Sequence, residues 1–341
     1  MTPSPPKPRI WLLFAHHFGD NVQIRAVAEA AAQGDAEITG FQLEFNAMRH
    51  YPKALLGATL ITLRRDPGFR PPWPDMVISS GRRPIPAARW IRNASGGKTR
   101  IVWIGRPCIP LDQVDLVLTT PQYMLPPAPN VVMFSMPFGV TTAATRRKRA
   151  VALLGGSSKA AHVTLAYVDR FADAAAAMAA KSGLPLSVST SPRSPEGAAA
   201  RLARRLPEAE IYDFRARKGE DNPYRRWLAE AGACLVSGDS ISLLSDALGA
   251  GAPVSLLPTP ARALLARFGD TWWGRRWFKN NGNRAWFRPP AHLPAIHARL
   301  VALGLARWED GLLRIDDVTP TVRAEHAEGI RRVRAVLHAP R

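Results

Sequence analysis

The sequence predicts an α/β protein made of two consecutive doubly wound halves, each with a mostly parallel sheet covered by helices on both faces. Short runs rich in Val, Ile and Leu alternate with alanine-rich helical stretches along most of the chain. This alternation restarts after a basic, linker-like segment that ends near residue 145. The chain has 341 residues, which is long enough for two domains that each bury a core.

The N-terminal half, residues 10–145, begins after a proline-rich stretch, residues 1–9, that is predicted to be disordered. Its predicted strands are short apolar runs that each lead into a turn. These strands are IWLLFA at 10–15, EITGFQLEF at 37–45, DMVISSG at 75–81, RIVWIG at 100–105, DLVLTT at 115–120 and NVVMFSMP at 130–137. The helices predicted between them are VQIRAVAEAAAQ at 22–33 and PAARWIRNAS at 86–95.

The C-terminal half, residues 146–300, repeats the same order of elements. Its predicted strands are VALL at 151–154, LSVSTS at 186–191, EIYDF at 210–214, ACLVSG at 233–238 and PVSLLP at 253–258. Its predicted helices span 163–180, 195–206, 222–232 and the residues after Ser240. Helical periodicity returns at 291–308 and 323–339, so residues 301–341 are predicted to be helices that pack back on the N-terminal domain.

The net charge of +19 is the clearest feature of the composition and predicts attraction to a polyanion. The basic residues are spread through predicted helices, so many of them can equally be solvated surface residues. No motif of a nucleic-acid-binding sheet or groove occurs, and binding to nucleic acid is not expected. No apolar run reaches the roughly 18 residues of a membrane span. The two cysteines are far apart and suggest neither a disulfide nor a zinc site, so we expect a cytoplasmic protein.

A glycine-serine turn follows the first strand of the C-terminal half. Glycine lets a backbone approach a ligand closely, and a helix that begins just beyond it points free N–H groups at an anion. The spacing of a Walker A loop is missing, and the turn can also be a simple strand–helix connection. The candidate anion-binding residues are Gly155, Gly156, Ser157, Ser158 and Lys159.

A second polar turn in the same half, SGDS at 237–240, leads into a helix that ends at Gly249 and Gly251. Asp239 or Ser240 can cap this helix, and capping is the simplest role for them. Ser242 and Asp246 lie one helical turn apart on one face, where a carboxylate could accept hydrogen bonds from a ribose. Two such turns can open to one crevice, because ligands of open α/β sheets bind at the carboxyl ends of strands. The candidate anion-binding residues of this turn are Ser237, Gly238, Asp239, Ser240 and Ser242.

Two loops of the N-terminal half carry candidate acceptor-side residues. His16, His17 and Asp20 follow the first strand and form a close cluster of candidate general bases. The alternative is that Asp20 caps the next helix and the histidines are ordinary loop residues. Arg82 and Arg83 follow the strand at 75–81 and could bind an acidic acceptor or belong to a surface turn.

A tryptophan- and arginine-rich stretch, DTWWGRRWFKNNGNRAWFRPP at 270–290, departs from the strand–helix pattern. Its glycines and asparagines argue against a long helix. Tryptophan and arginine together are typical of membrane interfaces, and the alternative is a packed, irregular segment between domains. The residues predicted to meet an acceptor or a membrane are Trp272, Trp273, Arg275, Arg276 and Trp277.

Several of these motifs resemble, in order along the chain, those of bacterial relatives of the plant mitochondrial fission ELM family. They are GDN-x-Q at 19–23, SSGRRPIPAARWIRNASGGKTRIVWIGRP at 79–107, DLVLTTPQYMLPPAPNV at 115–131, LLGGSSK at 153–159, DNPY at 221–224 and SGDSISLLSDALGAGAPV at 237–254. The family resembles two-domain glycosyltransferases of the GT-B type, whose donor nucleotide lies on the C-terminal domain. The resemblance therefore implies a GT-B-like chain with two Rossmann-like domains facing a central cleft.

The resemblance also implies roles for individual residues. The turn from Gly155 to Lys159 would bind the donor diphosphate, with Ser240 and Ser242 at the start of the next helix. Asp246 would contact the ribose, although the family more often has glutamate there. The loop with His16, His17 and Asp20 would hold the acceptor-side base.

Two functions follow from these expectations. The first is a glycosyltransferase that needs neither a metal nor a cofactor and moves a sugar from a nucleotide-diphosphate donor to an envelope or lipid-linked acceptor. It would work as a peripheral protein at the inner face of the cytoplasmic membrane, held there by anionic lipid. The second is a non-catalytic, membrane-associated scaffold that keeps the fold, because the plant protein is named for recruiting a fission machine and fold does not fix function.

Overall fold

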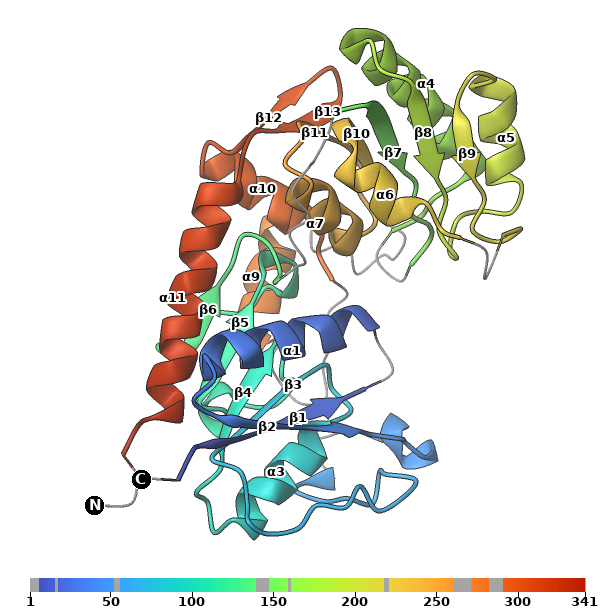
Figure 1. The fold of residues 1–341 in the computed structure, drawn as a ribbon. Helices are drawn as coiled ribbons and strands as arrows, with labels where there is room; N and C mark the ends of the chain where they lie inside the picture. The colour runs from blue at the N-terminus through green and yellow to red at the C-terminus, as the bar shows by residue number, and fades with distance from the viewer. Residues whose placement is uncertain are drawn as a thin grey trace. The chain divides into compact units, whose positions relative to one another are not determined.

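The structure is a computed structural model that divides the chain into two compact α/β units (Figure 1). It describes residues 6–15, 18–51, 56–138, 147–158, 161–217, 221–260, 271–281 and 291–340. Unit 1 comprises 1–134, 273–289 and 323–341, and unit 2 comprises 135–272 and 290–322. The division falls after Phe134, ahead of the boundary expected near residue 145, and the segment 273–289 joins unit 1. Each unit has a doubly wound sheet, as the sequence predicts, and a central cleft between the units stays a prediction.

Unit 1 has a six-stranded parallel sheet in the order β2-β1-β3-β4-β5-β6. The strands are β1 (Arg9–Phe14), β2 (Glu37–Gln42), β3 (Met76–Ser80), β4 (Arg100–Ile104), β5 (Leu116–Thr119) and β6 (Val131–Met133). The helical elements between these strands include α1 (Phe18–Ala32), α3 (Ile85–Ala94) and the 3-10 turns η1 (Ala47–His50), η2 (Leu111–Gln113) and η3 (Pro121–Tyr123). Arg9, the last residue of the stretch predicted to be disordered, already belongs to β1.

The central strands of unit 1 are buried on both faces, which explains their continuous apolar sequences. All five residues of β3 are buried, and α1 and α3 lie on opposite faces of the sheet in Figure 1. Trp11 of β1 and Trp103 of β4 belong to one hydrophobic core with Phe69. Burial of these large aromatic side chains stabilises the unit.

Unit 2 has a seven-stranded sheet in the order β12-β13-β11-β10-β7-β8-β9. Its parallel strands are β7 (Arg149–Leu153), β8 (Leu186–Ser189), β9 (Glu210–Tyr212), β10 (Ala231–Ser237) and β11 (Val254–Leu257). The helices that connect them are α4 (Leu165–Ser182), α5 (Ala198–Arg205), α6 (Tyr224–Ala229) and α7 (Ile241–Gly249), and α10 (Pro294–Ala302) follows later in the chain. The five parallel strands overlap the predicted ones. The helix predicted at 222–232 ends earlier, at Ala229, because β10 begins at Ala231.

The end of the predicted helix at 291–308 is wrong, because an antiparallel hairpin extends the sheet there. Strand β12 (Ala306–Glu309) pairs with β13 (Leu312–Ile315), and β13 pairs with β11. The helix stops at Gly304, which has a positive φ, and the hairpin turns at Asp310 and Gly311, which both have positive φ. An Asp-Gly pair is a strong hairpin signal, since this turn needs two left-handed residues.

The last helix, α11 (Thr319–Leu337), begins in unit 2 and continues into unit 1. Its C-terminal part packs on unit 1, where Gly329 lies against the ring of Phe134 and leaves no room for a Cβ. The Arg334 guanidinium donates to the carbonyl of Ala31 at 2.9 Å. No helix in the described ranges is both long and apolar enough to cross a membrane.

Candidate functional site

The two polar turns of unit 2 begin at neighbouring strand ends, at the point where the direction of chain winding reverses. From β7 the chain winds through β8 and β9 on one side and returns to β10 on the other. Strands β7 and β10 pair in parallel, with Leu153 opposite Val236. The turn at 154–158 and the turn at 237–240 therefore meet at a topological switch point, which is where open α/β sheets bind ligands.

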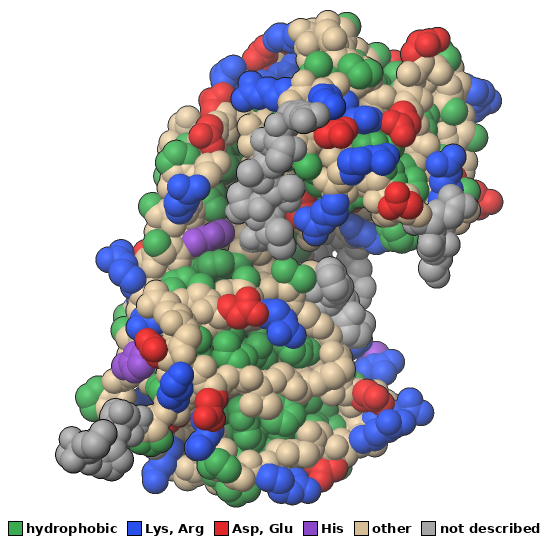
Figure 2. All heavy atoms as spheres, viewed as in Figure 1, with side chains coloured by type: hydrophobic (Ala, Val, Ile, Leu, Met, Phe, Trp, Pro, Cys, Tyr) green, Lys and Arg blue, Asp and Glu red, His purple; other side chains and the backbone are tan. Residues whose placement is uncertain are grey.

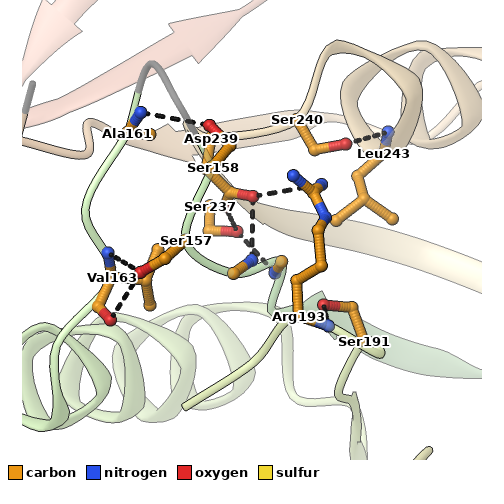
Figure 3. A network of polar contacts seen from close by, with 12 residues as sticks. Ser157, Ser158, Ala161, Val163, Ser191, Arg193, Ser237, Asp239, Ser240 and Leu243 are labelled. Atoms are coloured by element: carbon orange, nitrogen blue, oxygen red, sulfur yellow. Dashed lines mark hydrogen bonds and ion pairs between the residues drawn. The ribbon is translucent and has the colours of Figure 1, made fainter. Parts of the chain in front are cut away.

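The side chains of Ser237 and Asp239 link these two turns through buried hydrogen bonds (Figure 3). The Gly155 N–H donates to Ser237 Oγ at 2.7 Å, and Ser237 Oγ donates to Asp239 Oδ1 at 2.6 Å. The Gly156 N–H donates to Asp239 Oδ2 at 2.8 Å. Both side chains are buried, and this burial raises the pKa of Asp239 although the hydrogen bonds from Ser237 and Gly156 act to lower it.

This arrangement corrects the expected role of the two glycines. A Cβ on Gly155 would overlap the carboxylate of Asp239, and a Cβ on Gly156 would overlap the backbone carbonyl of Arg193. Glycine is needed because the protein's own groups approach the turn. The N–H groups of Gly155 and Gly156 do not project toward a ligand, since Ser237 and Asp239 already accept from them. Ser237 and Asp239 therefore support the turn from beneath rather than face a diphosphate.

The serines of the first turn hold the loop that follows it. Ser157 Oγ accepts from the Val163 N–H at 3.0 Å and donates to the Val163 carbonyl at 3.2 Å. Ser158 Oγ accepts from the Ala161 N–H at 3.1 Å. Within the described part of the chain, the Ser157 N–H donates to no acceptor. Lys159 lies outside the described residues.

The second turn leads into α7, whose N-terminus lies beside the first turn in Figure 3. Of the two residues predicted to cap this helix, Asp239 and Ser240, it is Ser240 that forms the N-cap. Its Oγ accepts from the Leu243 N–H at 3.5 Å. Gly238 packs under the end of β11, where a Cβ would lie 3.1 Å from the carbonyl oxygen of Leu257. The side chain of Ser242 is exposed at the start of the helix.

Asp246 has a partner that the sequence did not reveal. The Tyr224 hydroxyl donates to Asp246 Oδ2 at 2.8 Å, and the Tyr224 N–H donates to Asn222 Oδ1 at 3.0 Å. Burial raises the pKa of Tyr224, and the negative charge of Asp246 raises it further. The hydroxyl therefore stays protonated and orients one oxygen of the carboxylate. The DNPY motif was the available signal, although only the fold shows what its tyrosine contacts.

The candidate acceptor loops of unit 1 also lie at a switch point, because the chain moves from β1 to β2 on one side and to β3 on the other. Asn21 fixes the end of β1, since its side chain accepts from the Ala15 N–H at 3.2 Å and donates to the Ala15 carbonyl at 2.7 Å. Asp20 is partly buried in the first turn of α1. His16 and His17 lie outside the described residues.

Arg82 and Arg83 follow β3 and are partly buried. The backbone beside them is held by Trp103, whose Nε1 donates to the Gly81 carbonyl at 3.1 Å. Since β1 and β3 are adjacent strands, the loop that carries Asp20 and the loop that carries these arginines both start from the same edge of the sheet.

The tryptophan-rich stretch contains a short helix, α9 (Trp272–Asn281). Trp272, Trp273 and Trp277 are 57%, 71% and 42% exposed, and Arg276 is exposed as well. The spacing of Trp273 and Trp277 places them on one helical face. Residues 282–290 and the Arg275 side chain lie outside what the structure describes. Among the described residues, no three His, Cys, Asp or Glu side chains are grouped to hold a metal ion.

The chain belongs to the mitochondrial fission ELM1 family, whose model matches residues 19–271. No curated protein matches the chain in sequence.

The chain is similar in structure to several glycosyltransferases. One from Rickettsia africae is 9% identical, with a TM-score of 0.47 and coverage of 98% of this chain and 100% of that one. MurG from Acinetobacter baumannii is 14% identical, with a TM-score of 0.42 and coverage of 85% and 99%. The glycosyltransferase VinC, solved with dTDP, is 13% identical, with a TM-score of 0.44 and coverage of 95% and 100%. At these values the likeness assigns no residue roles.

Proposed function

We propose that this protein is a glycosyltransferase that moves a sugar from a nucleotide-diphosphate donor to an envelope or lipid-linked acceptor. The observation that carries the proposal is the meeting of two polar turns at the switch point of unit 2, beside the N-terminus of α7. An open parallel sheet binds its ligand at such a point, and a helix N-terminus favours a phosphate there. Membership of the ELM1 family is compatible with this function and does not decide it.

The donor diphosphate would lie over the first turn and against the start of α7. Ser157, through its N–H, and Ser158 and Lys159 would contact it from one side, with Ser240 and Ser242 on the other. Asp246, oriented by Tyr224, would accept hydrogen bonds from the ribose. Donors fixed in advance stabilise the negative charge that develops on a departing diphosphate.

The acceptor would bind unit 1 at the β1–β3 switch point. His16, His17 or Asp20 would remove the proton from the acceptor hydroxyl, since a neutral imidazole or a carboxylate can act as a general base. Arg82 and Arg83 would bind an anionic group of the acceptor. Lysine and arginine are spread over the visible face in Figure 2 and are mixed with acidic side chains.

The nucleotide donor gives the most direct test of this function. We expect UDP, GDP or dTDP to raise the melting temperature of the intact chain, because a ligand that binds only the folded state stabilises it. The nucleotide that stabilises would then be supplied as its sugar conjugate with a membrane extract, and transfer of labelled sugar to lipid would be measured. If no nucleotide changes the melting temperature, the proposal fails and the scaffold alternative takes its place.

We propose that α9 attaches the protein to an anionic membrane surface at the inner face of the cytoplasmic membrane. Its exposed tryptophans suit headgroup depth, and Arg276 together with the net charge of +19 favours anionic lipid. We expect the intact chain to float with phosphatidylglycerol vesicles, and the triple variant Trp272→Ala, Trp273→Ala, Trp277→Ala to lose most of this binding. The control is Trp308→Ala, which removes another exposed tryptophan, on β12. Equal flotation of the triple variant and the control would contradict the role of α9.

A further inference from the structure

A third loop reaches the switch point of unit 2. It follows β8, at residues 190–194, and is held tightly against the first turn. Ser194 Oγ donates to the Gly155 carbonyl at 2.6 Å, and the Ser191 N–H donates to Ser194 Oγ at 2.9 Å. The backbone of Arg193 packs directly against Gly156. The position of the Arg193 backbone is therefore fixed relative to the turn.

The guanidinium of Arg193 points toward the buried Asp239 and remains accessible to solvent (Figure 3). Arg193 Nη2 lies 3.7 Å from Asp239 Oδ2, which is an ion pair but longer than a hydrogen bond. The Arg193 side chain is 48% exposed, whereas that of Asp239 is 0% exposed. Within the described residues the guanidinium donates no hydrogen bond, so its planar set of donors remains available.

The charge of Asp239 explains why a cation is needed at this place. Its oxygens already accept from Gly156 and Ser237, and the remaining negative charge would repel a diphosphate that bound over the two turns. Arg193 lies next to this carboxylate and offsets the charge. Without Arg193, this ion pair would be lost and the negative charge of the buried Asp239 would no longer be offset by it.

We infer that Arg193 binds the phosphoryl groups of the ligand at this switch point, an inference that rests on the proposed function. The guanidinium is held in place by attraction to Asp239, and it presents its outward donors to a pair of phosphoryl oxygens. Arginine suits this role because its planar guanidinium can donate two parallel hydrogen bonds to two phosphate oxygens at once. The ligand class is a pyrophosphate group, either free or within a nucleoside diphosphate.

Inorganic pyrophosphate tests this inference without knowledge of the nucleoside. We expect calorimetry to detect pyrophosphate binding to the intact chain and a loss of about tenfold or more in affinity for Arg193→Ala. Arg193→Lys keeps the positive charge but lacks the paired donors of a guanidinium. Its affinity for pyrophosphate should lie between those of the parent and of Arg193→Ala. The matched control is Arg215→Ala, which removes an exposed arginine that contacts the same loop through the Pro192 carbonyl. This control should bind pyrophosphate as the parent does, and melting curves would establish that all variants fold.

The outcomes separate this inference from the proposed function. Equal binding by Arg193→Ala and Arg215→Ala would overturn the role of Arg193, even if nucleotides bind. If pyrophosphate binding depends on Arg193 but no nucleoside diphosphate binds, the role of Arg193 in binding an anion stands and the proposed glycosyltransferase function is wrong. If the parent chain binds neither pyrophosphate nor nucleotide, both proposals fall.

Discussion

Replacement of Gly156 by alanine is expected to destabilise unit 2 by about 3 kcal/mol or more. The new Cβ would overlap the backbone carbonyl of Arg193, and a backbone group cannot rotate away as a side chain can. The turn would have to move, which breaks the hydrogen bond from the Gly156 N–H to the buried Asp239. Urea unfolding of the purified variant measures this loss.

The matched control is Gly251→Ala, which makes the same chemical change in the same unit. Gly251 has a φ of +68° and nothing near its missing Cβ, so only the left-handed backbone conformation opposes alanine. We expect this control to cost about 1 kcal/mol. If Gly156→Ala unfolds at the same urea concentration as the control, the packing described for the turn is wrong.

Replacement of Asp246 by alanine is expected to weaken nucleotide binding by about 10- to 100-fold, because hydrogen bonds from ribose hydroxyls to a charged carboxylate would be lost. Affinity for inorganic pyrophosphate should not change, since pyrophosphate has no ribose. The parent should also prefer the bound nucleotide over its 2′,3′-dideoxy analogue, and Asp246→Ala should lose this preference. Titration calorimetry with the three ligands measures these differences.

Two further variants locate the effect of Asp246. Tyr224→Phe removes the hydroxyl that orients the carboxylate and should give a smaller loss of nucleotide affinity, with the preference for ribose kept. Asp221→Ala removes an exposed carboxylate in the neighbouring motif and should leave affinity unchanged. If Asp246→Ala still prefers the nucleotide over its 2′,3′-dideoxy analogue, Asp246 does not contact the ribose.

The positions of the parallel strands in both units were accessible from the sequence because buried parallel strands are continuous apolar runs. The hairpin of β12 and β13 was not predicted, because the run from residue 291 to residue 308 has helical spacing and overlaps the first strand of the hairpin. The tertiary pairing of this hairpin with β11 prevailed over the local helical pattern.

The location of the candidate site followed from the rule that parallel strands present their carboxyl ends at one edge. Its internal contacts could not be predicted in the same way. Asp239 has the sequence context of a helix cap, and only the fold brings its carboxylate beneath Gly156, far away in the chain. Arg193 was missed for a related reason, because its loop has no glycine pattern and its proximity to Asp239 depends on the order of β7, β8 and β10.

Hydrogen exchange, measured by mass spectrometry with and without a saturating nucleoside diphosphate, tests most directly whether the ends of β7, β8 and β10 hold the nucleotide. Gly155 and Gly156 already donate within the protein, so the account predicts that new protection falls on Ser157 and the first turn of α7, and on residues 190–194. Peptides from helix α5, on the far side of β8 in the chain order, should exchange as before. Protection confined to other parts of the chain, with none in these three segments, would contradict the account.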